Sequence, residues 1–147
     1  FKIFTRAELG SREDILYETY AKTLNIEALT MIHMASRQLL PVCISYSKKL
    51  ADAVIAVTEA GADASVQEEL LNEVSRELKS AKLALEALKI DEEKAGKITD
   101  AREQAFFYKD VVKTAMDELR APVDEVEMMV DKKAWPVPSY ADLMFEV

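Results

Sequence analysis

Residues 65–88 read SVQEELLNEVSRELKSAKLALEAL, and this stretch decides the fold class. Its apolar side chains return at alternating steps of three and four residues, which is the spacing of one face of an α-helix. Ser65, with Glu68 three residues later, has the pattern of a capping box, so we expect the helix to start there. The positions on the apolar stripe are Leu71, Val74, Leu78, Ala81, Leu85 and Leu88.

A second stripe of the same spacing precedes it. We expect its helix to start at Ser11, with Asp14 three residues on, and to end at Gly61, a residue that favours helix termination. Pro41 lies inside the stripe, where it removes one backbone hydrogen bond, so it predicts a kink rather than an end. The stripe consists of Leu29, Ile32, Ser36, Leu39, Cys43, Tyr46, Leu50, Ala53 and Val57.

A third helical segment follows, which we expect to open at Asp91. Pro122 is suited to the first turn of a short fourth helix that ends near Val130. The third stripe consists of Ala101, Ala105, Tyr108, Val112, Ala115 and Leu119. With three glycines and four prolines in 147 residues, the chain has too few turn residues for a β-sandwich or a βαβ fold.

The last sixteen residues, 132–147, differ from the rest. Each proline of the Trp135-Pro136-Val137-Pro138 run favours an extended conformation in the residue before it, so this run is not a regular helix. The segment is nevertheless too apolar for a free tail. It either folds back onto its own bundle or packs on a neighbouring subunit or an upstream domain. The interface candidates are Trp135, Tyr140, Leu143 and Phe145.

We therefore predict an all-α fold, a long antiparallel helical bundle of three or four helices, the first kinked at Pro41, with a non-helical aromatic C-terminal strap. The net charge of −8, with both signs interleaved, argues against nucleic acid or an anionic membrane as the main partner. No run of eighteen apolar residues predicts a membrane span. The single cysteine, Cys43, favours a reducing, cytoplasmic setting.

No residue pattern predicts a chemical site. His33 is the single histidine and has no second metal ligand at a fixed spacing, so we expect a structural or exposed residue. Cys43 lies on an apolar stripe and is expected in the core. Neighbouring carboxylates such as Glu68 and Glu69, Glu92 and Glu93, and Glu125 and Glu127 are expected on solvated faces. We accordingly assign no catalytic, cofactor-binding or metal-binding residue.

Three stretches together resemble the region that follows the catalytic core of type III glutamine synthetases. The first is residues 11–20 (SREDILYETY), with residues 25–28 (NIEA) and 31–35 (MIHMA). The second is Leu40-Pro41-Val42, with Tyr46 and residues 50–52 (LAD). The third, residues 135–143 (WPVPSYADL), is similar to that family's closing Trp-Pro-x-Pro-Thr/Ser-Tyr-x-Asp-Leu signature. His33 departs from the pattern, which has an aspartate there.

The resemblance implies a parent enzyme that joins ammonia to glutamate through a γ-glutamyl phosphate, with ATP and Mg²⁺ or Mn²⁺. The family's catalytic residues lie in an upstream β-rich domain, and no position here matches them. It further implies that residues 1–10 are a linker from that domain, 11–131 the bundle and 132–147 the strap, and that the partners are the upstream domain and other subunits of a ring-shaped homo-oligomer. A free-standing helical adaptor is the alternative that the residues leave open. A small helical enzyme lacks the convergent polar groups that catalysis needs.

Overall fold

The computed structural model describes residues 4–138 and 140–145, and for Tyr140, Ala141 and Phe145 the description covers the backbone. These residues form helices without a strand, so the predicted all-α class is confirmed. The elements are α1 (Arg6–Met34), the π-helical η1 (Ala35–Leu39), α2 (Leu40–Glu59), α3 (Ser65–Gly96), α4 (Ala101–Phe107), the π-helical η2 (Tyr108–Val112), α5 (Lys113–Glu127) and α6 (Tyr140–Phe145).

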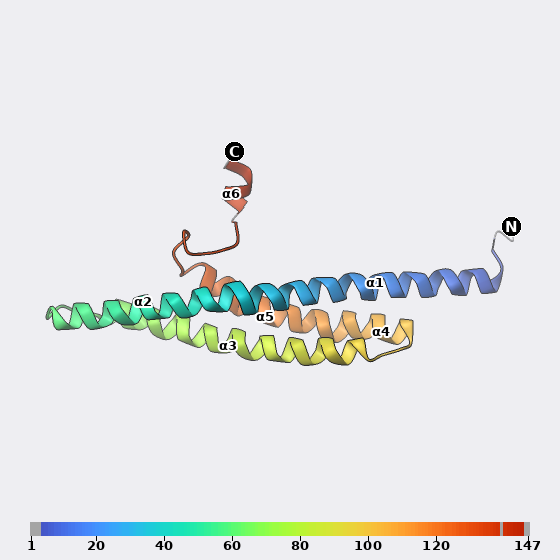
Figure 1. Ribbon diagram of the computed structural model, residues 1–147, viewed down its shortest axis with the longest axis horizontal. Coiled ribbons are helices and arrows are strands. Elements are labelled where there is room, and N and C mark those ends of the chain that lie inside the picture. The colour runs from blue at the N-terminus through green and yellow to red at the C-terminus, as the bar shows by residue number, and fades with distance from the viewer. Residues whose placement is uncertain (1–3, 139, 146–147) are drawn as a thin grey trace.

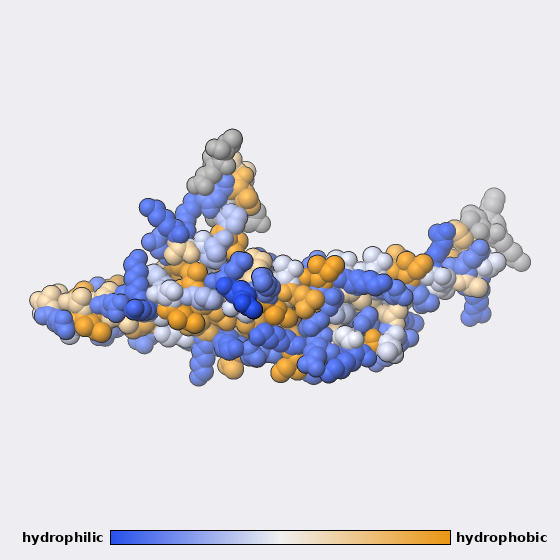
Figure 2. Space-filling view, in the orientation of Figure 1, coloured by the Kyte–Doolittle hydropathy of each residue, from blue (hydrophilic) through white to orange (hydrophobic). Residues whose placement is uncertain are grey.

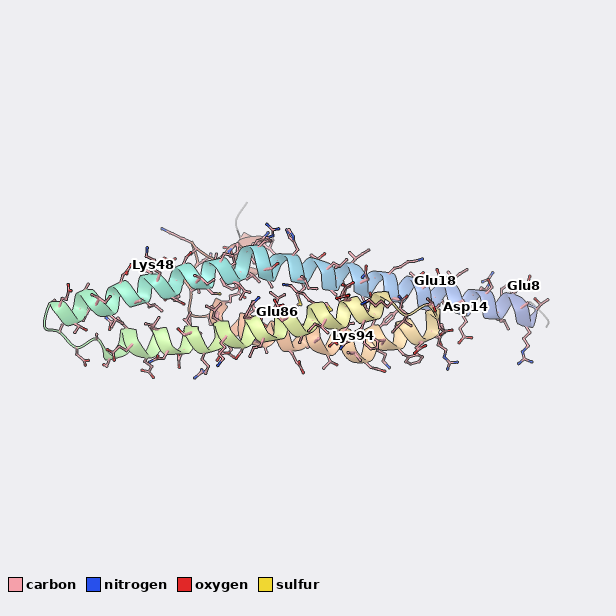
Figure 3. The ribbon with its side chains drawn as sticks, turned by 60° about the horizontal axis from the view of Figure 1, so that its bottom comes forward. Glu8, Asp14, Glu18, Lys48, Glu86 and Lys94 are labelled. Atoms are coloured by element: carbon pink, nitrogen blue, oxygen red, sulfur yellow. The ribbon has the colours of Figure 1, made fainter. Side chains whose placement is uncertain are left out.

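The elements join into three long arms. One arm runs without a break from α1 through η1 into α2, and α3 returns along it (Figure 1). The third arm, α4 through η2 to α5, packs on α3 and on α1. The first turns of α1 extend past the loop between α3 and α4 (Figures 1 and 3). None of the described helices combines the length and the apolar character that a membrane crossing requires.

The first arm begins earlier than the sequence pattern predicts. Thr5 is the N-cap of α1: its hydroxyl accepts from the Glu8 N–H, and its own N–H donates to Glu8 Oε2 at 2.7 Å. That hydrogen bond from the Thr5 backbone lowers the pKa of Glu8. The helix start predicted at Ser11 is therefore wrong. Thr5 with Glu8 is a complete capping box, and once capped there the helix runs straight through Ser11.

The first arm also continues through Pro41, as predicted. The π-helical turn η1 ends two residues before the proline, and the Leu40 N–H donates to Ala35 O, five residues back. A π turn is wider than an α turn, which relieves the crowding of the proline ring against the preceding turn. In Figure 3 the arm is arched rather than straight. Side-chain spacing alone carries no signal for this local change of helix type.

The turn between α2 and α3 confirms a predicted helix end at Gly61 and a predicted helix start at Ser65, and it corrects the predicted cap of that start. Gly61 has a φ of +76°, and its N–H donates to Thr58 O while the Ala62 N–H donates to Val57 O. This is the Schellman arrangement that satisfies the last carbonyls of a helix. The predicted capping box at Ser65 is wrong, because Ser65 is the first helical residue and its N–H donates to Asp63 Oδ1 at 2.9 Å.

The third arm starts later and runs further than predicted. Asp91 lies within α3, so the segment does not open there. It opens at Ala101, where the Asp100 side chain accepts from the Glu103 N–H at 2.8 Å. Pro122 is inside α5 and does not begin a fourth helix. Burial of Leu119 and Val126 on either side of it offsets the hydrogen bond that a proline removes, which costs about 3 kcal/mol.

The core closely follows two of the predicted stripes, the one from Leu71 to Leu88 and the one from Ala101 to Leu119. Val74, Leu85 and Leu88 of α3 are fully buried, as are Val112 and Leu119 of the third arm. The stripe from Leu29 to Val57 is correct from Leu39 to Leu50 but wrong at Leu29, which is 47% exposed. In α1 the buried side chains are instead Ala21, Leu24 and Ala28, followed by Ala35 of η1. These small residues let α1 approach its neighbours closely.

Candidate functional site

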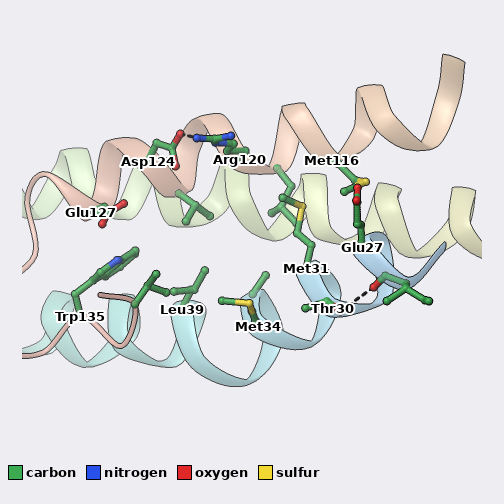
Figure 4. A pocket seen from close by; sticks show the side chains of 15 residues that line it. Glu27, Thr30, Met31, Met34, Leu39, Met116, Arg120, Asp124, Glu127 and Trp135 are labelled. Carbon is green, nitrogen blue, oxygen red and sulfur yellow. Dashed lines mark hydrogen bonds and ion pairs between the residues drawn. The ribbon is translucent and has the colours of Figure 1, made fainter. Parts of the chain in front are cut away.

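One apolar hollow is a groove between the first arm and α5, which we call the α1–α5 groove. Its volume is about 510 Å³. Met31, Met34 and Leu39 form one wall, and Met116, Leu119 and Val123 form the other (Figure 4). Trp135 and Val137 close one end. On the face shown in Figure 2, apolar side chains gather over the middle of the molecule, where α1 and α5 lie together.

Charged side chains stand along the rim of this groove. Arg120 Nε lies 3.0 Å from Asp124 Oδ2, so the guanidinium is already paired within α5. Glu27 and Glu127 also line the groove, at opposite ends, and neither forms an ion pair with a described residue (Figure 4). The rim therefore carries three carboxylates and one guanidinium, and an unbalanced negative charge remains at each end.

The segment after α5 is anchored by Trp135. Its ring packs on a small cluster in which Cys43, Val126 and Val130 are buried. Its Nε1–H is buried without an acceptor among the described atoms. Lys132 forms an ion pair with Asp142, which ties α6 back to the turn after α5.

Of the interface residues predicted from sequence, Trp135 thus packs on its own chain through one side of the ring and faces the α1–α5 groove with the rest. Leu143 is 70% exposed, and its neighbour Met144 is similarly exposed. The side chains of Tyr140 and Phe145 lie outside the described residues. The structure brings the described part of this set to one end of the groove and to α6, and whether these residues form an interface stays a prediction.

A second apolar surface, which sequence reasoning missed, covers the first half of α1. Leu9, Leu16 and Tyr20 are separated by seven and four residues, so they lie on one stripe of the helix. Leu16 is 70% exposed and Leu9 is 53% exposed. We call this set the N-terminal apolar face. Glu8, Asp14 and Glu18 lie along the same part of α1 (Figure 3).

The N-terminal apolar face continues onto α4. A hollow is lined by Leu16, Tyr17 and Tyr20 of α1 and by Phe106 of α4. The rings of Tyr17 and Phe106 lie 6.1 Å apart, and the Arg102 guanidinium is 5.9 Å from the Phe106 ring centre. The three-four spacing of residues 9–20 was a signal that could have revealed this surface.

One polar cluster joins all three arms. Asn25 Nδ2 donates to Glu92 Oε1 at 2.8 Å and to Tyr108 OH at 2.9 Å. Tyr108 is 2% exposed, and its burial raises the pKa of the phenol. Glu92 is half-buried, so its predicted place on a solvated face is wrong. The two hydrogen bonds of Asn25 therefore link the first arm to α3 and to η2.

The remaining candidates are placed as follows. Cys43 is 3% exposed, as predicted, and burial raises the pKa of its thiol. His33 is exposed near the end of α1. Glu68, Glu69, Glu93 and Glu125 are exposed. In the part of the chain that the structure describes, His, Cys, Asp and Glu side chains do not gather in threes as they would around a metal ion.

Comparison with known proteins finds similarity to one family. Residues 1–58 match the family model of the glutamine synthetase C-terminal domain. A glutamine synthetase of Butyrivibrio fibrisolvens is 32% identical over 147 residues, which are 99% of this chain and 21% of that protein. The chain is related to the C-terminal region of glutamine synthetases.

Two further relatives support this relationship to glutamine synthetase. A type-3 glutamine synthetase of Dictyostelium discoideum is 29% identical over 149 residues, and a glutamine synthetase of Bacteroides fragilis is 25% identical over 150 residues. They match 97% and 98% of this chain. The chain spans about a fifth of the length of each relative. The resemblance to the type III glutamine synthetase C-terminal region that the sequence motifs carry is thus confirmed.

Proposed function

We propose that this chain is the non-catalytic helical C-terminal region of a type III glutamine synthetase and that it supports packing of the enzyme's domains and subunits. The observation that carries the proposal is the share of each sequence that aligns. Nearly the whole of this chain aligns with each relative, but the aligned part is about a fifth of the relative's length. The reaction of the whole protein is then ligation of ammonia to glutamate, driven by ATP with Mg²⁺ or Mn²⁺, in the cytoplasm.

The chemistry of that reaction supports a non-catalytic role for this part. Phosphoryl transfer to a carboxylate is promoted by clustered metal ligands and by cationic side chains around the transferred group. The shaped hollows described above are lined mainly by apolar side chains, and Arg120 at the groove is already paired with Asp124. The catalytic groups therefore belong to the remaining four-fifths of the enzyme.

The N-terminal apolar face supports a packing role. Its stripe lies in the first half of α1, within the residues that match the family model. A contiguous exposed apolar surface commonly marks a contact with another part of a protein. We propose that the upstream part of the same synthetase covers this face, and that the segment after α5, which includes α6, packs in the assembled oligomer.

Two measurements test this function. Glutamine formation from glutamate, ammonia, ATP and Mg²⁺ is assayed for the 147-residue chain and for the intact synthetase. We expect only the intact synthetase to form glutamine. Glutamine formation by the isolated 147-residue chain would overturn the non-catalytic role. If the gene proves to encode this chain without a catalytic domain, the helical adaptor becomes the correct interpretation.

The second measurement is the mass of the intact synthetase after a double substitution, Leu16→Lys with Tyr20→Lys, determined by mass photometry. We expect a smaller or unstable assembly because both charges fall in the covered face. Ile44→Lys with Ile55→Lys on α2 is the matched control, since both isoleucines are also exposed. Equal masses for all three proteins would contradict the packing role.

A further inference from the structure

We propose that the α1–α5 groove is a docking site for a basic amphipathic helix of a separate partner protein. The proposal rests on the groove itself and goes beyond the packing role of the region within a synthetase. Three properties of the groove point to this occupant: its walls, its length and the charge of its rim.

The walls have the shape that receives a helix. They are two neighbouring helical arms, and the floor between them is apolar. An amphipathic helix commonly binds by laying its apolar face into such a groove. Met31, Met34 and Met116 supply most of the flexible lining, and methionine side chains adapt readily to the shape of a bound partner.

The length of the groove sets the length of the occupant. Ile26 and Leu39 line its two ends on the first arm, and at about 1.5 Å per residue they are about 20 Å apart. A partner helix of about thirteen residues, presenting large apolar side chains three and four residues apart, matches this length.

The charge of the rim selects the partner. Glu27 and Glu127 stand at opposite ends without ion-pair partners among the described residues, and Asp124 already neutralises Arg120. Lysine or arginine near both ends of the bound helix would therefore be attracted to the rim. A second copy of this chain fits less well, because each copy carries a net charge of −8.

The binding test uses the 147-residue chain and a labelled, tryptophan-free peptide of eighteen residues. The peptide has leucine at helical three-four spacing, alanine elsewhere and lysine near both ends, and its counterpart carries glutamate in place of each lysine. We expect saturable binding of the lysine peptide by fluorescence anisotropy, together with a change in the emission of Trp135, the chain's one tryptophan. Binding should weaken with added salt. Equal binding of both peptides, or of neither, would overturn the proposal.

Substitutions then locate the site. The double substitution Glu27→Lys with Glu127→Lys should weaken peptide binding at least about tenfold. The control, Glu118→Lys with Glu125→Lys, makes the same charge change at exposed positions of α5 outside the groove. It should change the affinity by less than about twofold. Met34→Gln should weaken it about fivefold, and Met128→Gln, at an 85% exposed residue, should not. Unchanged peptide affinity after the groove substitutions would overturn the proposal. It would also be overturned if the chain forms a dimer that the groove substitutions dissociate.

Discussion

The side chain of Asn25 shows how a single residue orders this molecule. Its amide nitrogen on α1 uses both hydrogens, one toward Glu92 on α3 and one toward Tyr108 on η2. A buried polar group that lacks its partner costs about 1–3 kcal/mol. Alternative registers of the three arms would leave these groups without partners, so the cluster selects one register among several that the apolar stripes alone would allow.

At this scale we predict the effect of Tyr108→Phe. The substitution keeps the packing of the ring but removes the oxygen that accepts from Asn25, so the free energy of unfolding should fall by about 1 kcal/mol. Urea denaturation followed by circular dichroism measures it. Tyr17→Phe is the control. The Tyr17 hydroxyl donates to Glu13, and both residues are on α1 with this hydrogen bond exposed to solvent, so the midpoint of the urea transition should not move. Equal effects of both substitutions would contradict a structural role for the cluster.

Residue environments were predictable where one apolar stripe decides them. Cys43 was placed in the core because it stands between Leu39 and Tyr46 at helical spacing. Glu92 was not predictable, because its partner Asn25 is 67 residues away in the sequence. The exposure of Leu29 was likewise not predictable, since the choice between Leu29 and its neighbour Ala28 depends on which side of α1 meets α3 and α4.

Among the elements, helix ends depended on the chemistry of a few residues. Gly61 was identified from sequence because a left-handed residue at a helix C-terminus is most often glycine. The start of α1 was misplaced, because several polar residues nearby could serve as the cap. The start of α3 at Ser65 was predicted correctly, but the capping box proposed there was not. Thr5 and Asp63 make the observed contacts in place of Ser11 and Ser65.

The two glycines at helix ends should respond oppositely to alanine. Gly61 has a positive φ, so Gly61→Ala should lower the free energy of unfolding by about 1 kcal/mol, although an added Cβ would meet no atom within 4 Å. Gly96 is the last residue of α3, its φ is not positive and its Cβ would also meet nothing, so Gly96→Ala should raise stability by about 0.5 kcal/mol. Thermal unfolding of the two variants beside the unsubstituted chain checks the signs. Stabilisation by both alanines would contradict the role of Gly61 as the left-handed residue of the turn.

The whole molecule is a long object rather than a rounded one (Figure 1). The first arm, Arg6 to Glu59, is about 80 Å long at about 1.5 Å per residue. A bundle of three arms, each in contact with the other two, still leaves much of each helix at the surface. This explains why apolar residues such as Leu16 and Ile26 remain exposed beside a fully buried core.

Small-angle X-ray scattering of the 147-residue chain should reveal this shape. We expect a maximum dimension of about 80 Å or more, because the first arm is continuous through Pro41. The radius of gyration should clearly exceed the value of about 15 Å for a compact domain of this length. Measurement at several concentrations separates the shape of one chain from association. A value near 15 Å would mean that the arm breaks at Pro41 and folds back.

The sequence by itself determined the all-α class, most of the apolar stripes and the relationship to type III glutamine synthetases. It could do so because helical spacing, the scarcity of glycine and proline, and the Trp-Pro-Val-Pro motif are local properties of the chain. The tertiary structure alone decided how the arms are paired, which side of α1 is buried, and that Met34, Met116 and Trp135 meet in one groove. These outcomes rest on contacts between residues far apart in the sequence, whose energies depend on the register of whole helices and not on any local pattern.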